Sequence, residues 1–510
     1  MTRPPDSAPT DPGAGARDHS RPDGDPVAQH SESPRVSRLA RTLDAAVIAC
    51  LLCAETFATV MWDWLDIGWS ISPLYGVALL LLAVRHGRYP KPSLASRIAS
   101  AASRAWHDTW TRRLLSLALA TRLLVLAVGL LGAVLIGQAN SPDDFRLSHN
   151  VIHNLPARYD AGWYLGIARK GYRWRPERAH RQQNIAFFPG FPVAMRIGGD
   201  LVTMPARILR DPWLFGNGNT RVVWGGAIVN ILAFTLALVR VRRYGLALGL
   251  RDDVAFFGAA LLACAPFAYF FSAPYSEGLF LLASVSTFAA WRSGSAGGVA
   301  GWGFLAGLTR SNGWTVSAAL IVDAALRWRE HRHDPRRLVA ALAPLAAAGL
   351  FSAYIFTLTG HPLAWMTAQQ AWGNRLTPFG FATARWGHIE RIGVGTYVAT
   401  DPGDAATVVC VLAVLVLTLV MLRRRQWLEA TFSLAYLLPG MVLDIPSLGR
   451  MTSVLFPAYL TLASLTRSAP GSLRSPGADR RRLAAWTVPA ALLALQLFFA
   501  FRFFGWKPPY

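Results

Sequence analysis

The chain has 510 residues, of which 53% are hydrophobic and only 16% are charged, whereas soluble domains carry roughly 25% charged residues. The formal net charge is +22, but the arginines gather in short segments between long apolar runs, as membrane topology requires. These features exclude a soluble protein and a nucleic-acid-binding protein, and they predict an all-α polytopic membrane protein.

The N-terminal part carries few signals of function. Residues 1–35 are rich in Pro, Ser, Asp and Gly without apolar periodicity, so we expect a disordered cytoplasmic tail. Residues 36–114 hold two predicted spans, 43–62 and 70–85, as a transmembrane hairpin followed by a basic cytoplasmic segment. Glu55 in the first span is the main ionisable residue at predicted midplane depth.

Residues 115–503 form the predicted membrane domain, because their apolar runs approach the ~20 residues that cross a bilayer. The runs predict spans at 115–136, 222–240, 253–272, 276–291, 296–309, 313–327, 338–358, 405–422, 428–443, 450–466 and 483–503. With the hairpin, about 11–13 transmembrane helices are expected, ending in a short external tail at 504–510.

The distribution of Arg and Lys sets the predicted orientation. It keeps the N-terminus in the cytoplasm and places two long loops, 137–221 and 359–404, on the external face. Residues 158–181 disagree with this rule, since they contain seven basic residues in a loop assigned outside. The rule acts mainly through short loops, and a basic cluster beside a membrane is a natural dock for a lipid phosphate. Residues 191–208 of the same loop have the apolar spacing of an amphipathic helix lying on the membrane.

The stretch from Arg158 to Tyr172 holds the strongest candidate for chemistry, Asp160. Aromatic neighbours and an adjacent arginine are the influences that tune a carboxylate for work as a general base. The residues alone leave open an alternative, in which Asp160 pairs with Arg158 or caps the helix that begins at Ala161.

The pattern Asp-Ala-x-x-Tyr-x-x-Ile-Ala-x-x-Gly-Tyr at 160–172, followed by Ala-Phe-Phe-Pro-x-x-Pro at 186–192, resembles the first luminal loop of the PIG-V family. These are the second mannosyltransferases of GPI-anchor assembly, with bacterial relatives, within the wider GT-C class of glycosyltransferases. Three later stretches, 272–280, 306–313 and 449–457, are similar to the family in the same order. The resemblance runs from about residue 115 to 503.

The resemblance implies a GT-C-type helical bundle at the cell membrane. It implies inverting transfer of a sugar, in the family mannose, from a polyprenyl-phosphate donor to a lipid, glycan or protein acceptor on the external face. In that reaction Asp160 takes the proton of the attacking hydroxyl, and the departing phosphate needs positive charge or donors. The candidate substrate- and donor-binding residues are Arg158, Tyr164, Glu277, Arg310, Asn312, Gln369 and Arg450.

Each of these residues also has a structural interpretation. The arginines suit interfacial anchors or partners of carboxylates, and a carboxylate at a helix start, such as Glu277, is stabilised by the helix dipole. In the second loop, Trp365, Gln369 and Trp372 share one helical face, which suits a sugar ring, a prenyl chain or an interfacial aromatic belt.

The sequence predicts no definite metal site, because no Asp-x-Asp pattern accompanies Asp160. A divalent cation is the one cofactor left open, with Asp143 and Asp144 as weak candidate ligands. The alternative function is a transporter or flippase of lipid-linked sugars, which would need midplane charges and paired broken helices. A non-catalytic subunit with the same scaffold is a third hypothesis.

Overall fold

The computed structural model describes residues 108–137, 146–208, 216–373, 377, 379–466 and 478–507. The chain divides into two compact units, Met1–Cys53 and Ala54–Tyr510, and every described residue belongs to the second. The predicted tail, the first two spans with Glu55, and the weak metal candidates Asp143 and Asp144 lie outside the described residues.

Helices make up the regular structure of the described residues, which contain no strand. In chain order the elements are α4 (Thr109–Gly132), η1 (Ala133–Gly137), α6 (Val151–Asn154), α7 (Ala161–Lys170), η3 (Pro176–Arg178), η4 (Asn184–Ala186), α8 (Gly190–Ile208), α9 (Gly218–Ala247), α10 (Asp252–Ala263), η5 (Ala268–Ser272), α11 (Glu277–Arg292), α12 (Ala296–Thr309), α13 (Thr315–Leu326), α14 (Trp328–His331), α15 (Pro335–Ala340), α16 (Ala343–Thr359), α17 (Ala364–Ala368), η6 (Gln369–Trp372), α18 (Gly380–Ile392), α19 (Val394–Thr400), α20 (Pro402–Arg423), α21 (Trp427–Val442), α22 (Leu448–Thr452), α23 (Phe456–Thr466) and α24 (Ala478–Phe504).

The all-α membrane fold predicted from the apolar runs is confirmed. Each predicted span within the described residues corresponds to one helix or to two in succession. Five described helical stretches are long and apolar enough to cross a bilayer alone: Thr109–Gly137, Gly218–Ala247, Pro335–Thr359, Pro402–Arg423 and Trp486–Phe504. The other described helices are shorter or less apolar, and the total number of transmembrane helices stays a prediction. The expected helix at 191–208 is α8, and its predicted position on the membrane surface also stays a prediction.

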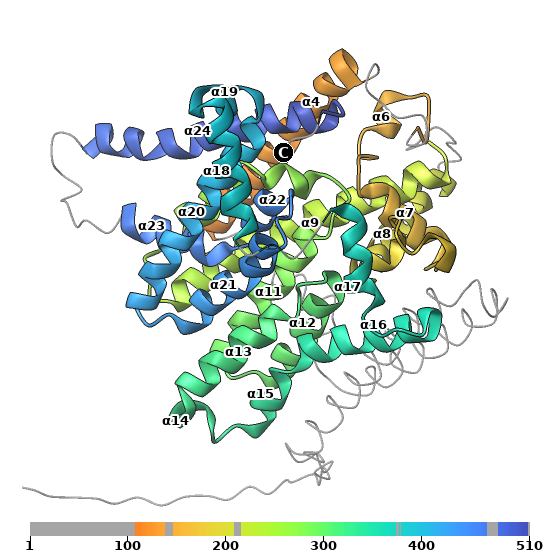
Figure 1. The fold of residues 1–510 in the computed structure, drawn as a ribbon. Helices are drawn as coiled ribbons and strands as arrows, with labels where there is room; N and C mark the ends of the chain where they lie inside the picture. Colours follow the sequence, from red (N-terminus) through yellow and green to blue (C-terminus); the bar gives the residue numbers. More distant parts are fainter. Residues whose placement is uncertain are drawn as a thin grey trace, which may run out of the picture. The chain divides into compact units, whose positions relative to one another are not determined.

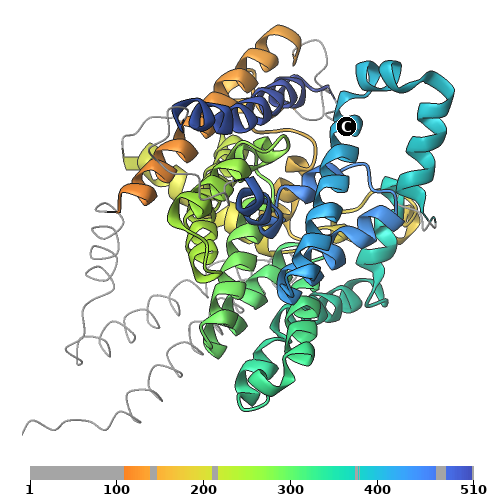
Figure 2. The ribbon, with the colours of Figure 1, turned by 90° about the vertical axis from the view of Figure 1, so that its left-hand side faces the viewer.

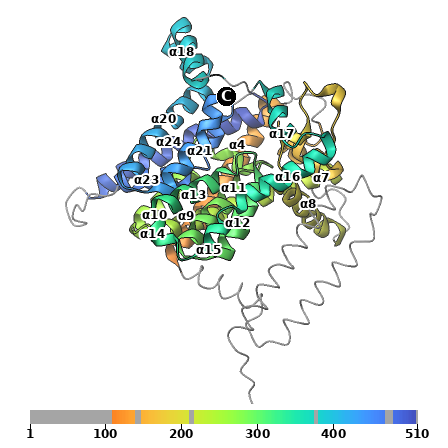
Figure 3. The ribbon, with the colours of Figure 1, turned by 60° about the horizontal axis from the view of Figure 1, so that its bottom comes forward.

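Helix α9 organises the packing, since it contacts α4, α8, α10 and α11. Helix α12 packs between α11 and α16, and α13 packs against α21. The first and last described helices, α4 and α24, pack against each other (Figures 1 and 2). Helix α16 leads into α17 (Figure 3). Helix α17 contacts η4 of the first long loop. Segments from both predicted loops are thereby brought together.

Charged side chains mark the two ends of α11, while its middle is uncharged and largely buried. At the C-terminal end, Arg292 lies 2.6 Å from Glu429 of α21. At the N-terminal end, Glu277 pairs with Arg310 and Arg450. The 16 residues of α11 separate these two groups by roughly 24 Å, at about 1.5 Å per residue. The helix therefore holds the Glu277 group far from the Arg292–Glu429 pair, at the end of the bundle where the sequence motifs lie.

The buried side chain of Arg122 in α4 stabilises the break between α10 and η5. Its guanidinium donates to the carbonyl oxygens of Ala263 and Ala268, to Ser272 Oγ, and to Gln496 Oε1 of α24 at 3.0 Å. An interrupted helix is tolerated at membrane depth where other groups satisfy its freed carbonyls. Arg122 does this, and it holds the chain that leads into Glu277.

Glycines permit a very close approach of α8 and α9. A Cβ atom on Gly225 would meet backbone atoms of Gly198 and Gly199 far inside van der Waals contact. Small residues at crossing points allow membrane helices to pack backbone to backbone. Because α8 also packs against α7, this crossing fixes the helix that begins directly after Asp160.

We predict that Gly225→Ala destabilises the protein, since the added methyl group must push α8 away from α9. Overpacking of this kind costs about 1–3 kcal/mol. The matched control is Gly349→Ala in α16, where a Cβ atom would meet nothing within 4 Å. Thermal unfolding in detergent should show a lower midpoint for Gly225→Ala and no loss for Gly349→Ala. Equal midpoints for the two variants would contradict the close crossing.

Candidate functional site

A cavity of about 330 Å³ opens where α7, α17, α21, α22 and the segment between α12 and α13 converge. Segments from the beginning, middle and end of the described chain line it. Six of the residues predicted for the site are among them: Asp160, Tyr164, Arg310, Asn312, Gln369 and Arg450.

Asp160 is held at the start of α7 by an unusual backbone conformation. The preceding residue, Tyr159, has a φ of 45°, in the left-handed region that few non-glycine residues adopt. Its ring packs against Phe503 and Trp506, at centroid distances of 5.3 and 5.1 Å. The backbone N–H of Asp160 also donates to the hydroxyl oxygen of Tyr275, at 3.2 Å. Tertiary contacts therefore set the direction of the Asp160 side chain.

The carboxylate of Asp160 pairs with neither of its expected local partners. It makes no capping hydrogen bond to α7, although Asp160 is the N-cap residue. Instead Oδ2 accepts a hydrogen bond from Arg450 Nη1 at 2.8 Å, and the side chain keeps 22% of its surface exposed. Its other oxygen, Oδ1, accepts no hydrogen bond from the described residues. Asp160 is one of the residues that line the cavity.

Behind Asp160 lies a fully buried carboxylate, Glu277. Its Oε1 pairs with Arg310 Nη1 and lies 3.1 Å from Arg450 Nε. Asp160, Arg450, Glu277 and Arg310 thus form a chain of alternating charges, here named the charge cluster. Two carboxylates and two guanidinium groups balance, which is the condition under which buried charges are stable.

Two hydroxyl groups complete the charge cluster. Ser276 Oγ accepts hydrogen bonds from Tyr164 Oη and Arg310 Nη1, both at 3.3 Å. The hydroxyl of Tyr275 accepts a hydrogen bond from the backbone N–H of Asp160 and donates one to the Arg158 carbonyl oxygen at 3.4 Å. The sequence motif at 272–280 contains both Tyr275 and Ser276, but only Glu277 was predicted as a site residue, because it carries a charge.

Arg158 lies away from the cavity, and its guanidinium is directed to backbone carbonyl groups. It donates to the oxygens of Phe504, Asn154 and Ala157 at 2.8, 2.7 and 2.9 Å, and it stacks over the ring of Trp506. Burial lowers the pKa of Arg158 to about 10. The structure therefore gives Arg158 a positioning role, joining the loop before Asp160 to the end of α24.

Aromatic side chains also line the cavity. Phe187, Phe188, Trp365 and Trp372 come from the two predicted loops. The indole N–H of Trp365 donates to Ser352 Oγ at 2.8 Å, and Gln369 Nε2 donates to the Ala186 carbonyl oxygen at 3.0 Å. The first of these hydrogen bonds ties the second loop to α16, and the second ties it to the first loop.

Comparison with known proteins identifies the first part of this site. Residues 141–359 match the family model described as Mannosyltransferase (PIG-V). The predicted resemblance to the PIG-V family is confirmed. This PIG-V-like region contains Asp160, Tyr164, Glu277, Arg310 and Asn312, whereas Gln369 and Arg450 lie beyond it.

Curated relatives agree with the family match. GPI alpha-1,6-mannosyltransferase 2 of Rattus norvegicus is 31% identical over 232 residues, which cover 43% of this chain and 44% of the relative. The protein of the same name from Cricetulus griseus is 31% identical over 172 residues, covering 34% and 32%. The Homo sapiens protein is 32% identical over 130 residues, covering 26% and 24%. The chain thus spans less than half the length of each of these relatives.

Solved structures of an oligosaccharyltransferase from Archaeoglobus fulgidus also resemble the chain. One was tethered with an acceptor peptide, and it aligns with a TM-score of 0.44 at 12% identity over 79% of this chain and 56% of that chain. A second, in complex with zinc and sulfate, aligns with a TM-score of 0.43 at 13% identity over 75% and 53%.

No group of three or more His, Cys, Asp or Glu side chains gathers within the part of the chain that the structure describes. The charge cluster itself offers only two carboxylates, and both already contact arginines. The guanidinium groups of the charge cluster come from Arg310, within residues 141–359, and from Arg450, beyond them.

We predict that Glu277→Gln lowers the free energy of unfolding by about 3 kcal/mol, because two buried guanidinium groups lose a compensating carboxylate. The double variant Glu277→Gln/Arg310→Gln should lose less than the sum of the two single variants, since it removes both partners of one pair. Unfolding in detergent measures each step, with the exposed Glu390→Gln in α18 as control. Strictly additive losses would contradict the coupling.

Proposed function

We propose that this protein is a membrane mannosyltransferase, in which Asp160 is the general base. The observation that carries this proposal is the geometry of Asp160: a partly exposed carboxylate paired with Arg450, in a cavity that also holds Arg310. The match of residues 141–359 to the PIG-V family supports the reaction class and the sugar.

In the proposed reaction the donor is a polyprenyl-phosphate sugar and the acceptor carries a hydroxyl group. Asp160 takes the proton of this hydroxyl while its oxygen forms a bond to the anomeric carbon. The bond between the anomeric carbon and the phosphate oxygen breaks, and the electron pair leaves with the polyprenyl phosphate. Attack opposite the leaving group inverts the configuration at the anomeric carbon.

Arg310 and Arg450 supply positive charge where the phosphate leaves. A fixed cation is worth most where charge develops in the transition state, because it needs no reorganisation at that moment. Their contacts with Glu277 hold both guanidinium groups in place before the donor enters. Tyr164 and Asn312 line the same cavity, where their polar groups suit sugar hydroxyls.

The aromatic side of the cavity suits the remainder of the substrates. Trp365 and Trp372 offer flat faces for a sugar ring or the first units of a prenyl chain, and Gln369 lies between them in the sequence. We place this cavity on the external face of the cell membrane, with the N-terminus in the cytoplasm. The acceptor is a lipid, a glycan or a protein with a reachable hydroxyl.

We predict that Asp160→Asn abolishes sugar transfer while leaving the fold intact. Losing a general base costs typically 10²–10⁴-fold in rate. Membranes or purified protein are supplied with polyprenyl-phosphate mannose, and release of the polyprenyl phosphate is measured. The matched control is Asp200→Asn, an exposed carboxylate on α8. Turnover of Asp160→Asn at the wild-type rate would remove Asp160 as the base.

A companion assay separates catalysis from transport. Proteoliposomes that move a lipid-linked sugar across the bilayer without breaking its glycosyl–phosphate bond would contradict the transferase proposal in favour of a flippase. Bond cleavage that depends on Asp160 supports the transferase.

A further inference from the structure

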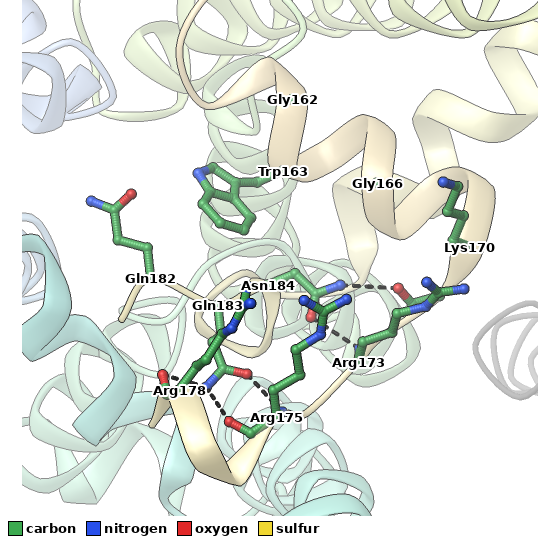
Figure 4. Close-up of a pocket in the computed structure, with 11 residues that line it drawn as sticks. Gly162, Trp163, Gly166, Lys170, Arg173, Arg175, Arg178, Gln182, Gln183 and Asn184 are labelled. Atoms are coloured by element: carbon green, nitrogen blue, oxygen red, sulfur yellow. Dashed lines mark hydrogen bonds between the residues drawn. The ribbon is translucent and has the colours of Figure 1, made fainter. Parts of the chain in front are cut away.

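A second cavity, of about 370 Å³, lies along α7 (Figure 4). Gly162, Gly166 and Lys170 line it at helical intervals of four residues. Asp160 and Tyr164, which line the first cavity, fall on the other side of the same helix. One short helix thus carries two different cavities.

The absence of side chains on this face of α7 creates the space. Gly162 and Gly166 leave the helix backbone bare, and a Cβ atom on Gly166 would meet nothing within 4 Å. Glycine inside a helix lowers its stability by roughly 0.5–1 kcal/mol relative to alanine. The two glycines therefore weaken α7, and they leave the cavity open.

The opposite wall is the segment 171–178, here named the strap. Gln183 accepts from the Arg175 N–H at 2.9 Å and donates to the carbonyl oxygens of Arg175 and Arg178 at 3.1 and 3.0 Å. Asn184 accepts from the Arg173 N–H and donates to the Gly171 carbonyl oxygen, at 3.1 and 3.0 Å. These amides hold the strap in one shape before any ligand binds.

The cavity is strongly basic. Lys170 extends from α7, and Arg173, Arg175 and Arg178 extend from the strap (Figure 4). No Asp or Glu is among the described residues that line it. Guanidinium groups can donate paired hydrogen bonds to the oxygens of a phosphate. Trp163 and the amide of Gln182 add an aromatic face and hydrogen-bonding groups suited to a polyol.

An aromatic partition separates this basic cavity from Asp160. The ring of Trp163 stacks on Phe187 at 6.0 Å and meets the edge of Trp372 at 5.7 Å, and both partners line the Asp160 cavity. A leaving phosphate must be bonded to the carbon under attack, so in the proposed reaction it shares the cavity of Asp160. An anion in the basic cavity is therefore a different phosphate, one that does not react.

We propose that the basic cavity binds the phosphate of an anionic membrane lipid whose headgroup carries hydroxyl groups. Arg173, Arg175 and Arg178 contact the phosphate, while Trp163 and Gln182 contact the polyol. Within the basic cluster predicted at 158–181 to bind a lipid phosphate, this proposal assigns the binding to Lys170 and the strap. This binding does not depend on sugar transfer, so it stands or falls separately from the proposed function.

The test compares lipid retention by four forms of the full chain. Wild type, Arg175→Gln/Arg178→Gln, Gly166→Leu and Arg181→Gln are purified in phosphatidylcholine nanodiscs that contain phosphatidylglycerol, and native mass spectrometry counts the phosphatidylglycerol retained. We expect at least a tenfold weaker affinity in the double arginine variant. Gly166→Leu should show a similar loss, because its side chain fills the cavity without removing charge. Arg181→Gln removes an exposed arginine that does not line the cavity, and it should behave as wild type.

Each outcome decides the proposal. Wild-type retention in Gly166→Leu, or equal loss in Arg181→Gln and the double variant, overturns it, since binding would then reflect exposed charge alone. Unfolding midpoints show whether any loss comes from misfolding. Competition distinguishes the source of the phosphate: displacement by glycerol 3-phosphate but not by inorganic phosphate supports a headgroup site, whereas equal displacement overturns the headgroup and leaves a free-phosphate site. Asp160→Asn should retain phosphatidylglycerol as wild type does, which separates this result from failure of the proposed function.

Discussion

The architecture of the site depends on one buried carboxylate. Glu277 is fully buried at the start of α11, where an unpaired charge would cost several kcal/mol. It is stable there because Arg310, which follows α12, and Arg450, in α22, both turn toward it. Three segments that are far apart in the sequence are thereby fixed to one point. Asp160 joins this point from the first loop through its contact with Arg450.

The interruptions between helices serve this arrangement. The chain leaves helical geometry between α10 and α11 and again between α12 and α13, and it breaks between α21 and α23 around the short α22. Each break places polar groups in or beside the charge cluster: Tyr275 and Ser276 at the first, Arg310 and Asn312 at the second, Arg450 at the third. Continuous helices would have carried these residues along lipid-facing or apolar surfaces. Such breaks are tolerated because protein groups, including Arg122, satisfy the freed backbone.

Sequence patterns predicted the features that depend on neighbouring residues, such as the helices. They missed contacts between residues that are far apart in the chain. Apolar run length located the helices, because crossing a bilayer imposes a length and a composition that a single segment must satisfy. Residue type within motifs indicated six side chains that line one cavity. The partner of Asp160 was missed, since Arg450 lies 290 positions away, and Arg158, next in the motif, turns instead to Phe504, 346 positions away. Tyr275 was missed for the same reason, because its hydroxyl group contacts the start of α7 only in the folded protein.

The charge balance of the site has a consequence for the proposed reaction. Before the reaction, Arg450 is shared between Asp160 and Glu277, so its attraction for a donor phosphate is partly offset. When Asp160 takes the proton of the acceptor, its negative charge disappears, and Arg450 loses one of its two compensating carboxylates. At the same moment the leaving phosphate gains negative charge. Under the proposed mechanism, the shared arginine therefore favours the transition state over the bound substrates. That is the condition under which an interaction accelerates a reaction and not merely binding.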